Sequence, residues 1–128
     1  MKFSYTIIYV RDVLQTVAFY EKAFNLKQRF IHESNQYGEM ETGETTIAFA
    51  SNQLAQSNLP SGFQENSLQN SPNGVEIGFV VDDVTTSFNC AVEAGAINVV
   101  EPKIKPWGQT VAYVRDLDGV LISINSPM

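Results

Sequence analysis

The chain has 128 residues, of which 44% are hydrophobic, and a formal net charge of −6. A chain of this length predicts one domain with a sizeable core, so we expect a single domain over residues 1–128. The acidic balance excludes the classes that depend on clustered Lys and Arg, namely nucleic-acid-binding proteins and binders of anionic membranes.

The chain shows no sign of export or membrane insertion. Its apolar stretches are only a few residues long, too short to span a bilayer. The segment Met1–Ser4 leads directly into a strand-like run and lacks the pattern of a signal peptide. The single cysteine, Cys90, cannot form an internal disulfide, which fits a reducing compartment. We therefore expect a cytoplasmic protein.

The first half of the chain predicts one strand, one helix and three further strands. Residues 6–10 are a β-branched and aromatic run typical of a strand. Asp12 and Gln15 then form a capping-box pattern at a helix start, and Asn25 suits a left-handed helix end. One helix face is apolar, at Val13, Val17, Tyr20 and Phe24. The three following strands are expected at 27–33, 36–41 and 45–50, with a tight turn at 42–44.

Residues 51–74 break this pattern. They are rich in Ser, Asn, Gln, Pro and Gly and contain one charged residue, Glu65. We expect a polar loop, and more than twenty residues is long for a loop in a compact domain. It is either a plain crossover or a cover over a functional site. Leu59 and Phe63 are its candidate anchors or ligand contacts.

The second half repeats the first. A strand at 75–81 precedes a helix capped by Asp82 or Asp83, and Asp83 follows Asp12 by 71 residues. The same offset relates the apolar helix positions, and Gly95 ends the second helix. Strands follow near 97–100, 109–115 and 120–125, with a hairpin turn at 116–119. The order is βαβββ–βαβββ, with modules at 1–50 and 75–128.

That order and several strings resemble the vicinal oxygen chelate superfamily, which includes glyoxalase I, extradiol dioxygenases and bleomycin-binding proteins. The strings are Tyr9–Val13 running into Phe19–Tyr20, Phe79–Val84, Pro106–Thr110 and, the strongest, Tyr113–Val120. The resemblance implies an α+β, glyoxalase-like fold, in which two βαβββ modules form a cup-shaped, eight-stranded mixed sheet with a ligand in its concavity. Exposed strand edges and apolar surface in this architecture lead us to expect a homodimer.

Side-chain alternation along each strand assigns the faces of that cup. One set of residues is expected to pack under the helices, and the other set faces the cleft. The cleft set is Tyr5, Ile7 and Tyr9; Thr46, Ala48 and Ala50; Glu76, Gly78 and Val80; and Leu121, Ser123 and Asn125.

The resemblance also implies where a metal ion would be bound. Metal-dependent members use one His or Glu from each of four strands, and the resembling positions here are Tyr5, Ala48, Glu76 and Ser123. Only Glu76 is an ordinary ligand for such an ion, and Ala48 has no donor atom. We therefore expect no metal or other cofactor.

The sequence is compatible with more than one role for Glu76 and for Trp107. Glu76 could act as a general base, bind a ligand cation or hydrogen-bond Tyr5 or Tyr9. Trp107 could line the cleft or close the core. The expected ligand-binding set is Tyr5, Ile7, Tyr9, Glu76, Trp107 and Ser123, with Glu76 as the candidate catalytic residue.

The other reactive residue types have simpler interpretations. The only histidine, His32, is expected to be structural or exposed. Cys90 is expected to be a buried, small hydrophobic residue. Arg115 is expected to pair with Asp116 in the hairpin or to bind an anion at the cleft rim. The acid pairs are interpreted as strand-face and cap residues: Glu39 with Glu41, and Asp82 with Asp83.

Three functions remain open. The first is a bleomycin-resistance-like protein that binds a small, partly aromatic molecule in its cup without metal. The second is a metal-dependent glyoxalase-type lyase or isomerase, similar to lactoylglutathione lyase. The third is a metal-free enzyme that uses Glu76 as its base.

Overall fold

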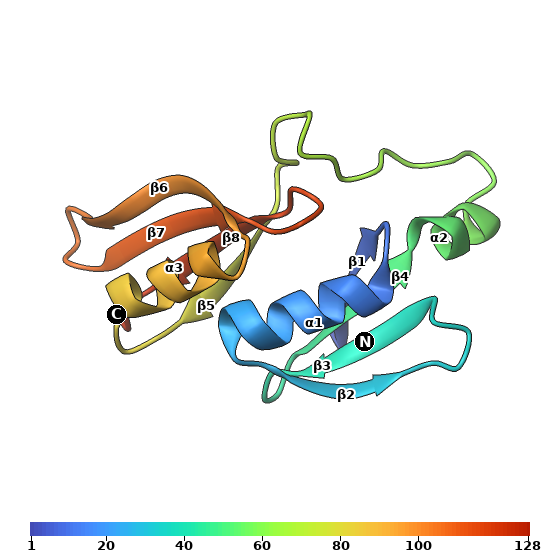
Figure 1. Cartoon of the computed structure of the whole chain (residues 1–128), viewed down its shortest axis with the longest axis horizontal. Coiled ribbons are helices and arrows are strands. Elements are labelled where there is room, and N and C mark those ends of the chain that lie inside the picture. The colour runs from blue at the N-terminus through green and yellow to red at the C-terminus, as the bar shows by residue number, and fades with distance from the viewer. The chain divides into compact units, whose positions relative to one another are not determined.

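The computed structural model describes all residues from 1 to 128 and divides the chain into two compact units, Met1–Glu65 and Asn66–Met128. Each unit contains the predicted order of one strand, one helix and three strands (Figure 1). The first unit consists of β1 (Tyr5–Val10), α1 (Val13–Phe24), β2 (Lys27–Ile31), β3 (Tyr37–Glu41), β4 (Thr46–Ser51) and the short helix α2 (Asn52–Asn58). The second consists of β5 (Glu76–Val80), α3 (Val84–Glu93), β6 (Ile97–Ile104), β7 (Thr110–Arg115) and β8 (Leu121–Asn125).

The two units have the same sheet topology. The first sheet has the order β1-β4-β3-β2, and the second has the equivalent order β5-β8-β7-β6. In each, the first strand pairs in parallel with the last, and the remaining pairs are antiparallel. The hydrogen-bonded strands thus form two four-stranded mixed sheets, which confirms the α+β fold of two βαβββ modules.

Helix α1 covers one face of the first sheet. The Asp12 carboxylate accepts a hydrogen bond from the Gln15 amide at 3.0 Å, and Asn25 ends the helix with a left-handed φ of 55°. Of the predicted apolar face, Val13, Val17 and Tyr20 are buried and Phe24 is half-buried. The Tyr20 ring lies 4.7 Å from the Phe49 ring of β4. Helix and sheet are therefore joined by an aromatic core.

Helix α3 repeats this arrangement on the second sheet. Asp83 is its N-cap and accepts from the Thr86 amide at 3.0 Å, and Gly95 follows its C-terminus. Val84, Phe88 and Ala91 are buried against the sheet. The prediction for Cys90 is wrong, because this residue lies off the buried stripe of α3 and is exposed.

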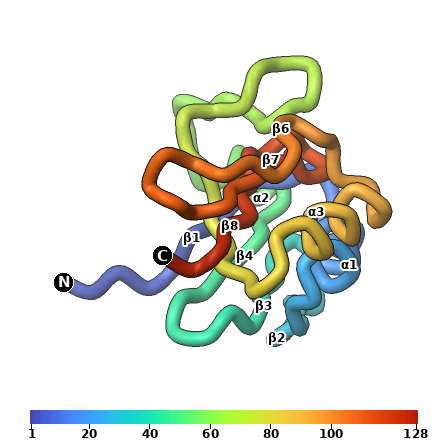
Figure 2. Tube along the Cα trace, turned by 90° about the vertical axis from the view of Figure 1, so that its left-hand side faces the viewer, coloured from blue at the N-terminus to red at the C-terminus, as the bar shows by residue number.

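The segment 51–74 is not a loop throughout. Ser51 caps α2 by accepting from the Leu54 amide at 3.0 Å, which the polar composition did not predict. The chain from the end of α2 to β5, shown in green in Figure 2, contains no other helix or strand. Its first part belongs to the first unit, where Phe63 contacts Tyr9 with ring centroids 4.9 Å apart.

Arg115 attaches the later part of this segment to the second unit. Its guanidinium donates to the carbonyl oxygens of Ser67, Asn70 and Gly119 at 2.8–3.0 Å. Gly119 has a φ of +94°, and a Cβ there would lie 2.6 Å from the Arg115 Nη2 atom. These bonds give Arg115 a structural role in holding this segment against the β7–β8 turn.

Strand β6 is longer than predicted. It reaches Ile104 rather than Val100 and passes through two register irregularities. Pro102 favours a strand end, but β6 is an edge strand and tolerates a residue without an amide hydrogen. No helix in the chain combines the length and apolarity that a membrane crossing requires.

Candidate functional site

The face of the first sheet opposite α1 is here called the first open face. Along β1, Ile8 and Val10 are 7% and 0% exposed and pack on the α1 side, whereas Tyr5 and Ile7 are 54% and 47% exposed. This alternation agrees with the faces expected from the sequence. It brings Tyr5, Ile7 and Tyr9 together on one strand of the first open face.

The β4 residues of the first open face are more buried than we expected. Thr46, Ala48 and Ala50 pair with Tyr5, Ile7 and Tyr9 of β1, so they share that face, yet all three are buried. The two alanines end at Cβ between the longer side chains of β1 and β3. The surface that a ligand can contact is therefore provided by the strands on either side of β4.

A β-bulge in β2 adds a cation to the first open face. The register shifts between Gln28 and Phe30, so that Arg29 and Phe30 both lie opposite Glu39. The Arg29 Nε and Nη2 atoms bind the two Glu41 carboxylate oxygens at 2.6 and 3.2 Å. The Nη1 atom donates to Glu39 at 3.2 Å and to Thr46 at 3.0 Å.

Glu39 is the buried centre of this network. It is 8% exposed, and its second carboxylate oxygen accepts the Tyr37 hydroxyl at 2.7 Å. We call Arg29, Tyr37, Glu39, Glu41 and Thr46 the polar cluster. Sequence reasoning identified Glu39 and Glu41 only as strand-face residues and missed the cluster, because the bulge that positions Arg29 has no local sequence signal.

The cluster perturbs the ionisation of its own members. Burial, and then the hydrogen bond to Glu39, raises the pKa of Tyr37, with a smaller contribution from nearby Tyr5. The hydrogen bond from Arg29 holds the pKa of Glu41 below its ordinary value. The hydrogen bond to Glu41 in turn raises the pKa of the Arg29 guanidinium. The cluster thus holds two carboxylates around one guanidinium through direct hydrogen bonds.

Aromatic rings flank the polar cluster and β1. The Phe30 and Tyr37 rings lie 6.0 Å apart, and the Phe63 ring meets Tyr9 edge-on with an interplanar angle of 69°. The first open face therefore combines aromatic rings, an exposed aliphatic side chain and a charged hydrogen-bond network within one unit.

The second sheet also has a face opposite its helix. Glu76 and Val80 of β5 are exposed there, whereas Ser123 of β8 is only 4% exposed. The Asn125 amide donates to the Ser123 hydroxyl at 2.9 Å and to the Phe79 carbonyl at 3.2 Å. A Cβ at Gly78 would lie 3.2 Å from the Ser123 Oγ atom, so the glycine leaves room for this pair. The Ser123 hydroxyl is thus already hydrogen-bonded within its own sheet.

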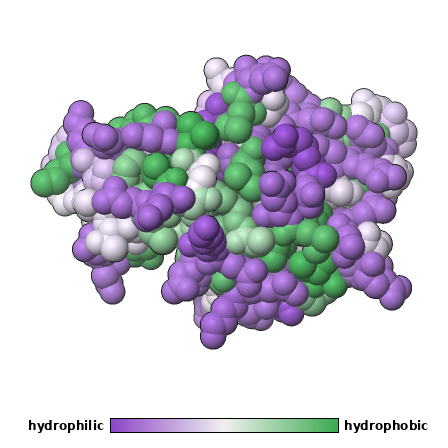
Figure 3. Space-filling view, in the orientation of Figure 1, coloured by the Kyte–Doolittle hydropathy of each residue, from purple (hydrophilic) through white to green (hydrophobic).

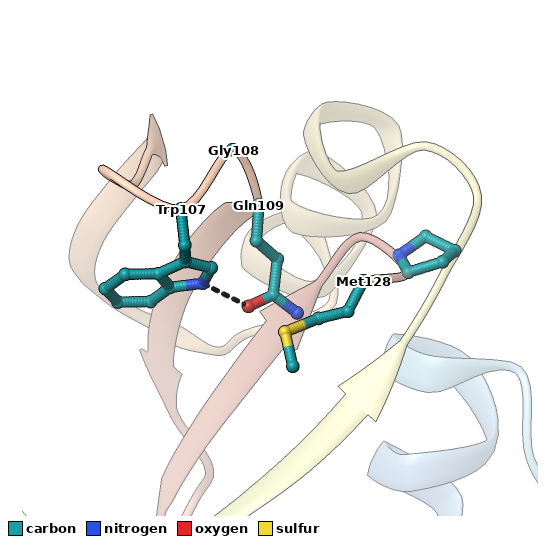
Figure 4. Close-up of a pocket in the computed structure, with 5 residues that line it drawn as sticks. Trp107, Gly108, Gln109 and Met128 are labelled. Atoms are coloured by element: carbon teal, nitrogen blue, oxygen red, sulfur yellow. Dashed lines mark hydrogen bonds between the residues drawn. The ribbon is translucent and has the colours of Figure 1, made fainter.

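Trp107 lies apart from the other predicted site residues of the second unit. It is 64% exposed in the loop before β7, and its indole N–H donates to the Gln109 side chain at 2.9 Å (Figure 4). It lines a shallow pocket of about 620 Å³ whose other residues are Gly108, Gln109, Pro127 and Met128. Neither Glu76 nor Ser123 contributes to that pocket. Trp107 therefore does not close the core.

The residue types present do not suit a divalent metal ion. No group of three or more His, Cys, Asp or Glu side chains is placed to hold one. Of the four family-related positions, Ala48 offers no donor and the Ser123 hydroxyl is engaged by Asn125. His32, the only imidazole, is exposed and bonded to Ser34.

Hydrophobic side chains reach the surface of both units. Figure 3 shows green hydrophobic atoms interrupting the hydrophilic surface. Isolated exposed apolar residues are ordinary, but contiguous ones on a sheet face indicate binding. The hydrophobic residues with the highest exposed fraction, apart from those at the chain ends, are Tyr5, Val75, Val80, Ile104 and Trp107.

Comparison with known proteins agrees with the fold. A family model described as a glyoxalase-like domain matches residues 3–128. A glyoxalase-related enzyme from Fulvimarina pelagi is similar in structure, with a TM-score of 0.84, 17% identity, and coverage of 99% of this chain and 88% of that one. A hypothetical protein from S. aureus gives 0.83 at 24% identity, covering 99% and 95%. A glyoxalase/bleomycin resistance protein/dioxygenase family enzyme from Burkholderia phytofirmans gives 0.75 at 24% identity, covering all of both chains. No curated protein matches the sequence.

Proposed function

Because the chain belongs to the glyoxalase-like domain family, we propose that it is a binding protein for a small, partly aromatic organic molecule and uses no metal ion. The observation that carries the proposal is the first open face, where Tyr5 and Ile7 are about half exposed beside Tyr9 and the polar cluster. Aromatic and aliphatic walls with a few placed polar groups are typical of small-molecule sites. We further propose that the protein works as a homodimer in the cytoplasm.

The donor chemistry supports binding without metal. Glyoxalase-type lyase chemistry needs several imidazole or carboxylate ligands around one ion. Here the related positions include Ala48 and a hydrogen-bonded Ser123. A bound organic ligand would instead meet ring faces and the half-buried Tyr37 side chain.

Nothing in the surroundings of Glu76 favours the enzyme hypothesis. A general base is usually activated by a partly apolar, desolvated setting, and Glu76 is exposed at the start of β5. Glu76, Ser123 and Trp107 remain proposed ligand contacts. Each is best tested by its own substitution.

The proposal is tested with 4-ethylphenol, a neutral aromatic probe, in a calorimetric or NMR titration. The wild-type protein is titrated with and without EDTA, and the variants Tyr5→Ala and Ile7→Ala are compared with Leu14→Ala. Leu14 is a matched control, because it is 47% exposed like Ile7 but lies on α1. Ile7→Ala removes about 40–50 Å² of contact, which corresponds to about 1 kcal/mol or roughly fivefold in affinity.

Weakening by Tyr5→Ala and Ile7→Ala but not by Leu14→Ala, with EDTA having no effect, would support the proposal. Equal affinity in all three variants would place the probe elsewhere and refute the site. Loss of binding in EDTA, restored by nickel or zinc, would favour the metal-dependent alternative.

A further inference from the structure

Toward a ligand on the first open face, the Tyr37 hydroxyl of the polar cluster can act only as a hydrogen-bond acceptor. The Tyr37 hydroxyl has one hydrogen, and that hydrogen is donated to Glu39 at 2.7 Å. Its oxygen can therefore only accept a further hydrogen bond. Tyr37 is half-buried, so part of this residue is open to solvent beside the cluster.

Most of the guanidinium donors of the cluster are already engaged. Arg29 directs its guanidinium to both Glu41 oxygens, to Glu39 and to Thr46. One guanidinium and two carboxylates leave the cluster with a net charge of −1. A ligand group beside Tyr37 therefore meets acceptors and an excess negative charge.

The position of the cluster relative to the aromatic residues indicates where the ring of a ligand and its polar substituent would lie. Glu39 pairs with Ala48 across β3 and β4, and Ala48 pairs with Ile7 on β1. Tyr37 lies in ring contact with Phe30. A ring seated against β1 and its neighbours would therefore have its substituent within reach of Tyr37 and Glu39, two strands away.

We propose that the polar cluster makes this site selective for arylalkylamines, with the ligand ammonium group donating to the Tyr37 hydroxyl oxygen and attracted by the Glu39 and Glu41 carboxylates. This inference rests on the proposed function and narrows its ligand class. An anionic ligand is disfavoured, since it would approach a cluster with an excess negative charge in which most guanidinium donors are already engaged. Tyr37 and Glu39 are the residues that determine specificity.

The test uses three probes with one 4-hydroxyphenyl ring: tyramine, neutral 4-ethylphenol and anionic 3-(4-hydroxyphenyl)propionate. Wild-type protein should bind tyramine at least tenfold more tightly than the propionate, with 4-ethylphenol between them. Tyr37→Phe keeps the Arg29–Glu39 ion pair and should weaken tyramine at least fivefold while leaving 4-ethylphenol unchanged. Glu39→Gln should remove most of the preference for the amine, and its melting temperature is measured to confirm folding.

Two controls separate this effect from general charge and from loss of structure. Glu44→Gln removes one exposed negative charge in the β3–β4 turn and should leave the preference intact. Tyr113→Phe removes the hydroxyl of a half-buried tyrosine of the second sheet and should leave the preference for the amine unchanged.

Each outcome is decisive. Equal binding of the three probes, or equal weakening of all three by Tyr37→Phe, overturns the amine selectivity and leaves the proposed function standing. The same loss of preference in Glu44→Gln assigns it to overall charge and also overturns the inference. If no probe binds at millimolar concentration, both the inference and the proposed function fail.

Discussion

Removing the Asp116 carboxylate should destabilise the β7–β8 turn strongly. Asp116 is 0% exposed, and its Oδ1 atom accepts the backbone amides of Asp118 and Val120 at 3.0 and 2.9 Å. Asp116→Ala leaves both amides without this acceptor, one of them in a buried setting. Unsatisfied buried groups cost about 1–3 kcal/mol each, so we expect a loss of about 2–4 kcal/mol in the free energy of unfolding.

Urea denaturation followed by circular dichroism measures this loss, and Asp116→Asn is the control. The asparagine keeps an acceptor oxygen at the same place and should cost about 1 kcal/mol or less, in line with one weakened neutral bond. A loss below about 0.5 kcal/mol for Asp116→Ala would refute the assigned role of the two bonds. Equal losses in both variants would instead assign the effect to the charge.

Two further predictions concern acid stability and assembly. Hydrogen bonds from the Thr86 backbone, and then from the Thr86 side chain, hold the pKa of Asp83 below its ordinary value of 3.8. The ionised Asp83 carboxylate therefore contributes to stability above pH 3.8, and this contribution is lost as the pH falls further. Asp83→Asn keeps an N-cap but should flatten the fall of stability below that pH in acid titrations, and an unchanged slope would contradict the assignment. For assembly, light scattering at micromolar concentration should give twice the 14.2 kDa chain mass, and a monomer would count against the homodimer.

Local sequence patterns were sufficient to predict the repeated part of the fold. Asp12 and Asp83 cap their helices as predicted, and the apolar stripes of both helices are buried. Alternation also assigned Tyr5 and Ile7 to the face opposite α1, because side chains on a regular strand strictly alternate.

The features that were missed depend on irregular or long-range structure. The polar cluster requires the β2 bulge and the β2–β3 register, neither of which is encoded by a turn or cap residue. Helix α2 follows β4 directly, with Ser51 serving both as the last strand residue and as the cap. The Arg115 contacts to Ser67 and Asn70 join segments far apart in the chain, which no local pattern could reveal.

The bulge at Arg29 also makes the cation of the polar cluster depend on a single extra residue in β2. Pairing on one side of the bulge matches Gln28 with Met40, and pairing on the other side matches Phe30 with Glu39, which is the next residue along β3. Deleting Arg29 would thus leave a regular hairpin with every flanking pair intact. Loss of this one residue would therefore remove the cation of the cluster while preserving the pairing of the sheet.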